Sequence, residues 1–337
     1  MLVPLSVKSY VEVMRSLSLP TRNRALITAV ILLSATACEK SKPAKNPADA
    51  IMPDGVAALD LGTKPQILFQ VFGDRDSPRM MPIAAVVNSV IKPIGLTLRN
   101  WTQLDSMYMA PGTKYPFYIE GGDPGELTVV GDTTFTLPGC AAVKPMSVVQ
   151  LAFKKPRSDP TVEFLASSGP LTPQRDANDS KFMTSADIEQ LARRIGHDVG
   201  KRANLSAAEL DSLDFHARMI QTGASKAPTL LISFIDPNAG TKSGGEWTGH
   251  IFALADSGAN GYEATYVHTA KGDAKKVEFQ RLVNHVDFNG DGADEIIVEA
   301  WKYAADNDLV VLSFKGGRWQ EVLRVKQDWC LDLPKEK

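Results

Sequence analysis

The chain has 337 residues, with 37 Lys and Arg against 39 Asp and Glu, which gives a formal net charge of −2. Hydrophobic residues make up 44% and charged residues 23% of the chain, a composition that is typical of globular proteins and excludes a largely disordered one. A net charge so close to zero argues against nucleic acid as a partner, because nucleic-acid-binding proteins usually carry a clustered basic surplus. The length allows two domains or one large β-rich domain.

The N-terminal segment has the features of a secretory signal peptide. An apolar run at residues 25–33 follows three arginines and precedes four small residues, 34–37. The run is about half as long as the ~20 residues that span a bilayer, so a permanent transmembrane helix is the weaker interpretation. Residues 1–37 are therefore predicted to be a signal peptide that is removed on export.

Cys38 directly follows the small residues, and this arrangement resembles a bacterial lipoprotein signal. The resemblance implies that Cys38 becomes the lipidated first residue of the mature chain and anchors it to the membrane. Residues 39–55 are polar and Pro-rich, and residues 38–62 are predicted to be a solvated tether between the anchor and the fold. We expect a lipid-anchored protein of the cell envelope, at the outer membrane or the periplasmic face. Ala35–Ala37 also fits ordinary cleavage, which would give a soluble periplasmic or secreted protein.

The other two cysteines, Cys140 and Cys330, are available to each other if Cys38 is lipidated. In an oxidising compartment they could form one disulfide that closes a very long loop. The alternative is two separate buried thiols, and the sequence does not decide between these readings.

Residues 63–170 are predicted to form a β domain. Short apolar runs rich in Val, Ile and Phe alternate with Gly, Pro and Asp, as in β-strands joined by turns. No helical stretch of ten residues is expected to interrupt them. This half is predicted to be a small barrel or a sandwich. The expected strands are Ile67–Phe72, Ile83–Val87, Tyr115–Ile119, Glu126–Val130, Val148–Phe153 and Val162–Leu165.

Residues 171–225 are predicted to be a linker with a short helical insert. A polar stretch rich in helix breakers, residues 168–184, marks the domain boundary. Thr184 with Asp187, and Ser206 with Glu209, have the spacing of capping boxes at helix starts. The first helix has apolar residues at helical spacing at Ile188, Leu191, Ala192, Ile195 and Val199.

Residues 226–337, together with the end of the insert, are predicted to form an antiparallel meander of the propeller-blade type. Eight expected strands are joined by short links, and Lys315–Arg318 has the composition of a tight hairpin turn. A faint repeat relates Phe215–Phe234 to Phe279–Glu299, a period that suits four-stranded blades. The strands are Phe215–Gln221, Thr229–Ile235, His250–Ala255, Tyr262–His268, Val277–Val286, Glu295–Trp301, Leu309–Phe314 and Trp319–Val325.

One segment of this half carries a candidate metal site, between the strands that end at Val286 and begin at Glu295. Oxygen-bearing side chains alternate at its first, third and fifth positions, a glycine follows at the sixth, and a carboxylate stands at the ninth. Calcium prefers six to eight hard oxygen ligands, and this spacing supplies most of them. The alternative is an acidic hairpin loop that holds water. The predicted ligands are Asp287, Asn289, Asp291, the backbone carbonyl of Ala293 and Glu295.

The residues from Asp287 to Glu295 are followed by a strand, and in this they resemble the calcium loops of FG-GAP and VCBS-type propeller repeats. The resemblance covers about residues 277–325. It implies a β-propeller-like blade, calcium as a structural ion, and a role in adhesion or binding rather than catalysis.

Two further groups of residues are candidates for function. His250 and His268 lie on neighbouring predicted strands, where Glu263 or Asp256 could join them, although isolated histidines on strands are more often packing residues. Aromatic residues in the C-terminal half could stack on sugars or anchor a protein partner, and packing within a β-sheet is the commoner role. These aromatic residues are Trp247, Trp301, Trp319, Trp329, Tyr262, Tyr266 and Tyr303.

Together these features indicate an exported, non-catalytic binding or envelope-associated protein with a structural calcium loop. A protein or a glycan is the expected partner, besides the membrane itself. A periplasmic hydrolase that acts on glycans or envelope polymers is the first alternative, and a purely structural envelope lipoprotein is the second.

Overall fold

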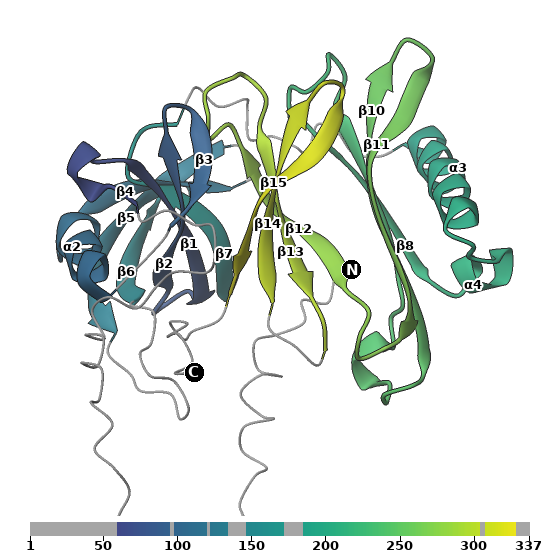
Figure 1. Cartoon of the computed structure of the whole chain (residues 1–337), viewed down its shortest axis with the longest axis horizontal. Coiled ribbons are helices and arrows are strands. Elements are labelled where there is room, and N and C mark those ends of the chain that lie inside the picture. Colours follow the sequence, from purple (N-terminus) through teal and green to yellow (C-terminus); the bar gives the residue numbers. More distant parts are fainter. Residues whose placement is uncertain are drawn as a thin grey trace, which may run out of the picture. The chain divides into compact units, whose positions relative to one another are not determined.

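The computed structural model describes residues 59–94, 98–119, 122–133, 146–171, 185–303 and 307–327. These residues form one β-barrel and two four-stranded antiparallel sheets, with few helices (Figure 1). The mainly β class predicted from the sequence is confirmed. The signal peptide, all three cysteines and Trp329 lie outside the described residues, so the lipid anchor and the disulfide stay predictions.

The first half is a six-stranded antiparallel barrel, one of the two architectures expected for it. The strands follow the order β1-β7-β4-β5-β6-β2, and pairing of β1 with β2 closes the ring. Closure leaves none of these six strands as a free sheet edge. A short strand, β3, pairs with β2 beside the ring. The strands are β1 (Gln66–Asp74), β2 (Arg79–Val87), β3 (Val90–Pro93), β4 (Lys114–Ile119), β5 (Gly122–Thr133), β6 (Met146–Phe153) and β7 (Thr161–Ser167).

The barrel interior is packed with aliphatic and aromatic side chains. Ile67, Phe69 and Val71 of β1 all belong to this core, as expected from the alternation of side chains along a strand. Phe69 stacks on Tyr115, with ring centroids 5.3 Å apart. The interior is therefore a hydrophobic core that holds this half together.

A helix, α2 (Leu98–Tyr108), interrupts the strands of the barrel half. The expectation that no such helix occurs there is wrong. Leu104 and Tyr108 of this helix are buried in the barrel core, and the Tyr108 hydroxyl donates to the carbonyl of Pro65 at 2.7 Å. Leu98, Trp101, Leu104 and Tyr108 recur at helical spacing, but most of the residues between them are polar and the helix has only 11 residues, so this periodicity is easily missed among the strands.

The second half contains all eight predicted strands, divided into two sheets. Sheet I has the order β11-β10-β9-β8 and sheet II the order β12-β13-β14-β15, so each is a meander of consecutive strands. Because β8 pairs with β9, sheet I begins within the segment 171–225 that was predicted to be a linker and insert. The strands are β8 (Asp214–Ile220), β9 (Thr229–Ile235), β10 (Trp247–Gly258), β11 (Gly261–Asp273), β12 (Phe279–Val286), β13 (Glu295–Trp301), β14 (Asp308–Lys315) and β15 (Arg318–Lys326).

The hairpin between β14 and β15 is confirmed at its predicted position. Lys315 pairs with Arg318 across a two-residue turn, and Gly316 and Gly317 have φ of 59° and 80°. Positive φ at both central positions is the requirement of a type I′ turn, which glycine meets without strain.

The helices of the insert begin close to their predicted starts. Helix α3 (Ala186–Arg202) is capped by Ser185, whose hydroxyl accepts from the N–H of Ile188, so the capping box predicted at Thr184 and Asp187 is wrong by one residue. The capping box of Ser206 and Glu209 at the start of α4 (Ala207–Asp211) is confirmed, with bonds of 2.6 and 3.2 Å. Short 3-10 turns lie at η2 (Leu61–Thr63) and η4 (Ala239–Thr241).

Three hydrophobic clusters connect these layers. Helix α3 packs on one face of sheet I, beside which it is drawn in Figure 1. Residues of sheets I and II share a second cluster, which includes Phe252 and Val298. Residues of sheet II and the barrel share a third, which includes Ile297 and Tyr118. Sheet II is therefore buried on both faces.

Gly196 of α3 tests the packing of this helix on sheet I. A Cβ added there would overlap the ring of Phe234 on β9. Gly→Ala within a helix usually stabilises it by about 0.5–1 kcal/mol, but we expect Gly196→Ala to lower the free energy of unfolding by about 1–3 kcal/mol through overpacking. Urea denaturation measures the difference. Gln190→Ala, at an exposed position of the same helix, is the control, and a Gly196→Ala chain as stable as this control would contradict the packing described.

Candidate functional site

The predicted calcium loop connects β12 to β13, so it has the expected strand–loop–strand setting. Phe288 is buried in the cluster that sheet II shares with the barrel. The N–H of Asp294 donates to the carbonyl of Thr222, in the connection between β8 and β9 of sheet I, at 2.7 Å. The loop therefore contacts both the barrel side and sheet I.

The first residue of the loop, Asp287, organises its turn. Its carboxylate is buried and accepts from the N–H groups of Gly290, at 2.7 Å, and Gly292, at 3.0 Å. Both glycines have positive φ, 78° and 91°, which lets the backbone wrap around the carboxylate. The loop thus folds around the side chain of its first predicted ligand.

The next two predicted ligands repeat the pattern in shorter turns. The side-chain carbonyl of Asn289 accepts from the N–H of Asp291 at 2.8 Å, and the carboxylate of Asp291 accepts from the N–H of Ala293 at 2.9 Å. Such local bonds are characteristic of Asn and Asp in turns. Asp291 is exposed, so its charge faces solvent.

Glu295, the ninth residue, is the most buried of the predicted ligands. Its carboxylate accepts from the N–H of Phe288 at 2.9 Å, from the Ser313 hydroxyl at 3.1 Å, and from the side-chain amide of Asn289. Burial raises the pKa of this carboxyl to about 8, and the nearby charge of Asp291 adds to the rise, while the Phe288 N–H opposes it. A cation in the loop would favour the charged form.

The donor atoms of the loop suit calcium in kind. Three carboxylates, one amide oxygen and one backbone carbonyl are all hard oxygens. A carboxylate oxygen that accepts one hydrogen bond keeps a second lone pair, so the turn bonds do not prevent ligation. Among the described residues, no three His, Cys, Asp or Glu side chains are gathered so that they could hold a metal ion, so binding would require the carboxylates to close inward.

His285, near the end of β12, pairs with a side chain of the loop. Its Nδ1 lies 2.8 Å from the carboxylate of Asp294, and both side chains are buried. The pair fixes the residue that precedes Glu295 and thereby helps to hold the loop against β12.

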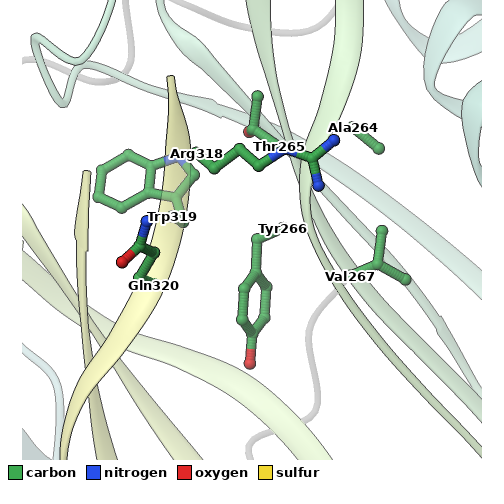
Figure 2. Close-up of a pocket in the computed structure, with 7 residues that line it drawn as sticks. All are labelled: Ala264, Thr265, Tyr266, Val267, Arg318, Trp319 and Gln320. Carbon is green, nitrogen blue, oxygen red and sulfur yellow. The ribbon is translucent and has the colours of Figure 1, made fainter. Parts of the chain in front are cut away.

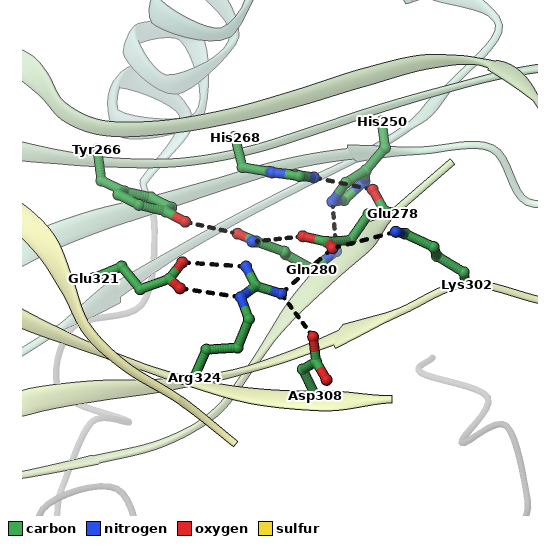
Figure 3. Close-up of polar contacts among 9 residues, drawn as sticks. All are labelled: His250, Tyr266, His268, Glu278, Gln280, Lys302, Asp308, Glu321 and Arg324. Atoms are coloured by element: carbon green, nitrogen blue, oxygen red, sulfur yellow. Dashed lines mark hydrogen bonds and ion pairs between the residues drawn. The ribbon is translucent and has the colours of Figure 1, made fainter. Parts of the chain in front are cut away.

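His250 and His268 approach each other as expected, with ring centroids 5.9 Å apart (Figure 3). His250 Nδ1 lies 3.0 Å from the carbonyl of Phe234, and its Nε2 accepts from the N–H of Gln280 at 2.9 Å. The Nδ1 proton and the neutral ring follow from these partners. Burial lowers the pKa of His250 to about 3, and His268 adds to this effect. His250 therefore joins β10 to β9 and to β12 of the other sheet.

Neither Asp256 nor Glu263 joins the histidines. Asp256 is buried, where its carboxylate accepts from the hydroxyls of Thr229, at 2.5 Å, and Thr265, and from the indole N–H of Trp319 at 2.8 Å. Trp319 belongs to sheet II and is 3% exposed, so it is a packing residue that also ties the two sheets together.

A polar network continues from the histidines toward β15 (Figure 3). The Tyr266 hydroxyl donates to the side-chain carbonyl of Gln280 at 3.1 Å, and the Gln280 amide donates to Glu278 at 3.4 Å. Arg324 of β15 donates to Glu278 and bonds both oxygens of Glu321. The network locks the orientation of Tyr266.

A pocket of about 320 Å³ lies between β11 and β15, the edge strands of the two sheets (Figure 2). The ring of Tyr266 points between the strands, and the Arg318 side chain extends from β15 toward β11 in Figure 2. Among the described residues, the side chain of Arg318 has no hydrogen bond or ion pair. The lining residues are Ala264, Thr265, Tyr266, Val267, Arg318, Trp319 and Gln320.

Sequence reasoning singled out Tyr266 and Trp319 as aromatic candidates but not Arg318 or Gln320. These side chains are ordinary surface residues in the sequence, and only the approach of β15 to β11 brings them to Tyr266. Trp301 stacks on Phe279, with ring centroids 5.4 Å apart, which is the packing role expected for most of the aromatic residues.

Comparisons with protein-family models, with curated proteins and with solved structures give no match to this chain. Of the helices that the structure describes, none combines the length and apolar composition that crossing a bilayer requires.

His250 predicts how stability depends on pH. Its pKa is about 3 in the folded chain and about 6.5 when unfolded, so protons bind the unfolded chain more tightly. The contribution of His250 to the free energy of unfolding is complete above pH 6.5 and is lost as the pH falls toward 3. At pH 5, about 2 kcal/mol of this contribution is lost. Urea denaturation at pH 7 and pH 5 should show that His250→Phe removes this dependence. The exposed His216, changed in the same way, is the control and should leave it intact.

Proposed function

We propose that this chain is an exported, lipid-anchored binding protein of the cell envelope, with a structural Ca²⁺ in the loop from Asp287 to Glu295. The pocket between β11 and β15 is the observation that carries the binding role. It offers an aromatic ring and a guanidinium without a partner among the described residues, both accessible from an open groove. The role of the anchor would be to hold this groove at the membrane surface.

Calcium would act on stability rather than on chemistry. Asp287, Asn289, Asp291 and Glu295 would bind it with their side chains, and Ala293 with its carbonyl. The loop contacts sheet I through Asp294 and the barrel cluster through Phe288. A cation there would neutralise clustered carboxylates at a junction of layers.

The hydrolase alternative would need carboxylates, or histidines free to act as bases, that line a pocket. Both ring nitrogens of His250 are engaged with backbone groups, and His268 Nε2 lies 2.9 Å from the carbonyl of Glu278. Neither histidine lines the pocket between β11 and β15, and no Asp or Glu is among its lining residues. No observation on the described residues favours this alternative over binding.

Calcium should raise the melting temperature of the chain. We expect 1 mM Ca²⁺ to raise it by about 2–6 °C relative to a chelator, since a ligand present at tens of times its Kd stabilises by about 2 kcal/mol. Differential scanning calorimetry measures the shift. Asp291→Asn, at an exposed ligand, should abolish most of it without unfolding the chain, whereas Asp211→Asn at the end of α4 should not. A melting curve that is the same in Ca²⁺ and chelator would reject the calcium site.

The anchor is tested separately from the ion. Wild-type chain expressed in a bacterium with an alkyne fatty acid should take up the label and sediment with membranes, because acylation buries apolar chain in the bilayer. Cys38→Ala should lose the label, while Cys140→Ala should keep it. A mature chain that begins at residue 38, is unlabelled and remains in the soluble fraction would show ordinary cleavage after Ala37 instead.

A further inference from the structure

We propose that the pocket between β11 and β15 binds a carboxylate-bearing sugar unit, such as a uronic acid of a glycan. This inference rests on the proposed binding function and names the chemistry of its ligand. The volume of the pocket, about 320 Å³, falls at the lower end of the range of small-molecule sites, so the pocket suits one ring-sized unit rather than a large cofactor.

The wall of the pocket is a pre-oriented aromatic ring. Tyr266 is held by its hydroxyl bond to Gln280 at 3.1 Å and by an edge contact to Phe252, with centroids 6.2 Å apart. A ring fixed in this way loses little entropy when a ligand packs against it. The C–H face of a sugar ring would cover the accessible side of this ring.

The polar groups that line the pocket divide into engaged and available ones. The Thr265 hydroxyl and the Trp319 indole N–H both donate to Asp256, so they are committed to the fold. The Arg318 guanidinium remains available, and Gln320 uses only its amide N–H group, toward the carbonyl of Lys315 at 3.3 Å. The pocket therefore offers one cation from Arg318, and one acceptor and one remaining N–H donor from Gln320.

These two groups specify the ligand. A planar guanidinium binds a carboxylate with two parallel hydrogen bonds, which a neutral sugar cannot form. The side-chain carbonyl of Gln320 can accept a bond from a ligand hydroxyl, which an aromatic acid without hydroxyl groups cannot donate. A ring that carries both a carboxylate and hydroxyl groups, as a uronic acid does, satisfies both.

The full chain, purified as the cell makes it, can be titrated with methyl glucuronide, methyl glucoside and benzoate by isothermal calorimetry or ligand-observed NMR. We expect methyl glucuronide to bind at least about tenfold more tightly than methyl glucoside, which lacks the carboxylate, since one charge-assisted pair is worth about a factor of ten or more. It should bind severalfold more tightly than benzoate, which has the carboxylate but lacks the hydroxyl group that bonds Gln320. Arg318→Gln should weaken glucuronide binding about tenfold, and Gln320→Ala less strongly. Arg194→Gln on α3, whose residues do not line the pocket, should change nothing.

Two binding results would contradict the proposed uronic-acid site. Absence of glucuronide binding, or equal binding to the wild type and Arg318→Gln, overturns this inference but leaves the calcium and anchor experiments to decide the proposed function. Benzoate binding as tightly as glucuronide overturns the assignment to a sugar. Melting curves of Arg318→Gln and Gln320→Ala, both altered at exposed positions of β15, verify that the variants are folded.

Discussion

Sheet II is buried on both faces, and the rest of the structure depends on this double burial. Along β13, Ile297 contacts the cluster shared with the barrel, while Ile296 and Val298 contact the cluster shared with sheet I. A strand in this position carries apolar residues on both faces, so the usual alternation of polar and apolar residues disappears. Polar groups that enter these interfaces must be matched by partners, because water does not reach them.

Both interfaces of sheet II contain such matched polar groups. Toward the barrel, the buried side-chain amide of Asn284 on β12 donates to the carbonyl of Tyr118 on β4 at 2.7 Å. Toward sheet I, Asp256 accepts from Trp319, and His250 bonds the backbone of β12. Removing one partner from a buried pair costs more than the pair contributes, since the other is left unsatisfied. These contacts therefore fix which surfaces meet more than they add to stability.

Local features of the fold could be predicted from the sequence, and pairings between distant segments could not. Short apolar runs between turn residues located every strand of sheets I and II, and the loop at Asp287 was found because its residues lie within nine positions. Helix α2 was missed, since Leu104 and Tyr108 carry its core contacts among polar neighbours. The pocket was missed because Tyr266 and Arg318 lie on different sheets, and local spacing gives no sign that their edges approach.

The faint repeat that relates Phe215–Phe234 to Phe279–Glu299 corresponds to equivalent hairpins in the two sheets. Each segment forms the first hairpin of a four-stranded meander, β8–β9 in sheet I and β12–β13 in sheet II. The connections of the two hairpins meet where Asp294 donates to Thr222. Of these two connections, only the one in sheet II has acidic residues at the spacing of a calcium loop. The repeat therefore reflects strand length and order, which packing imposes on both sheets. The candidate ion site depends instead on residues that only the second hairpin carries.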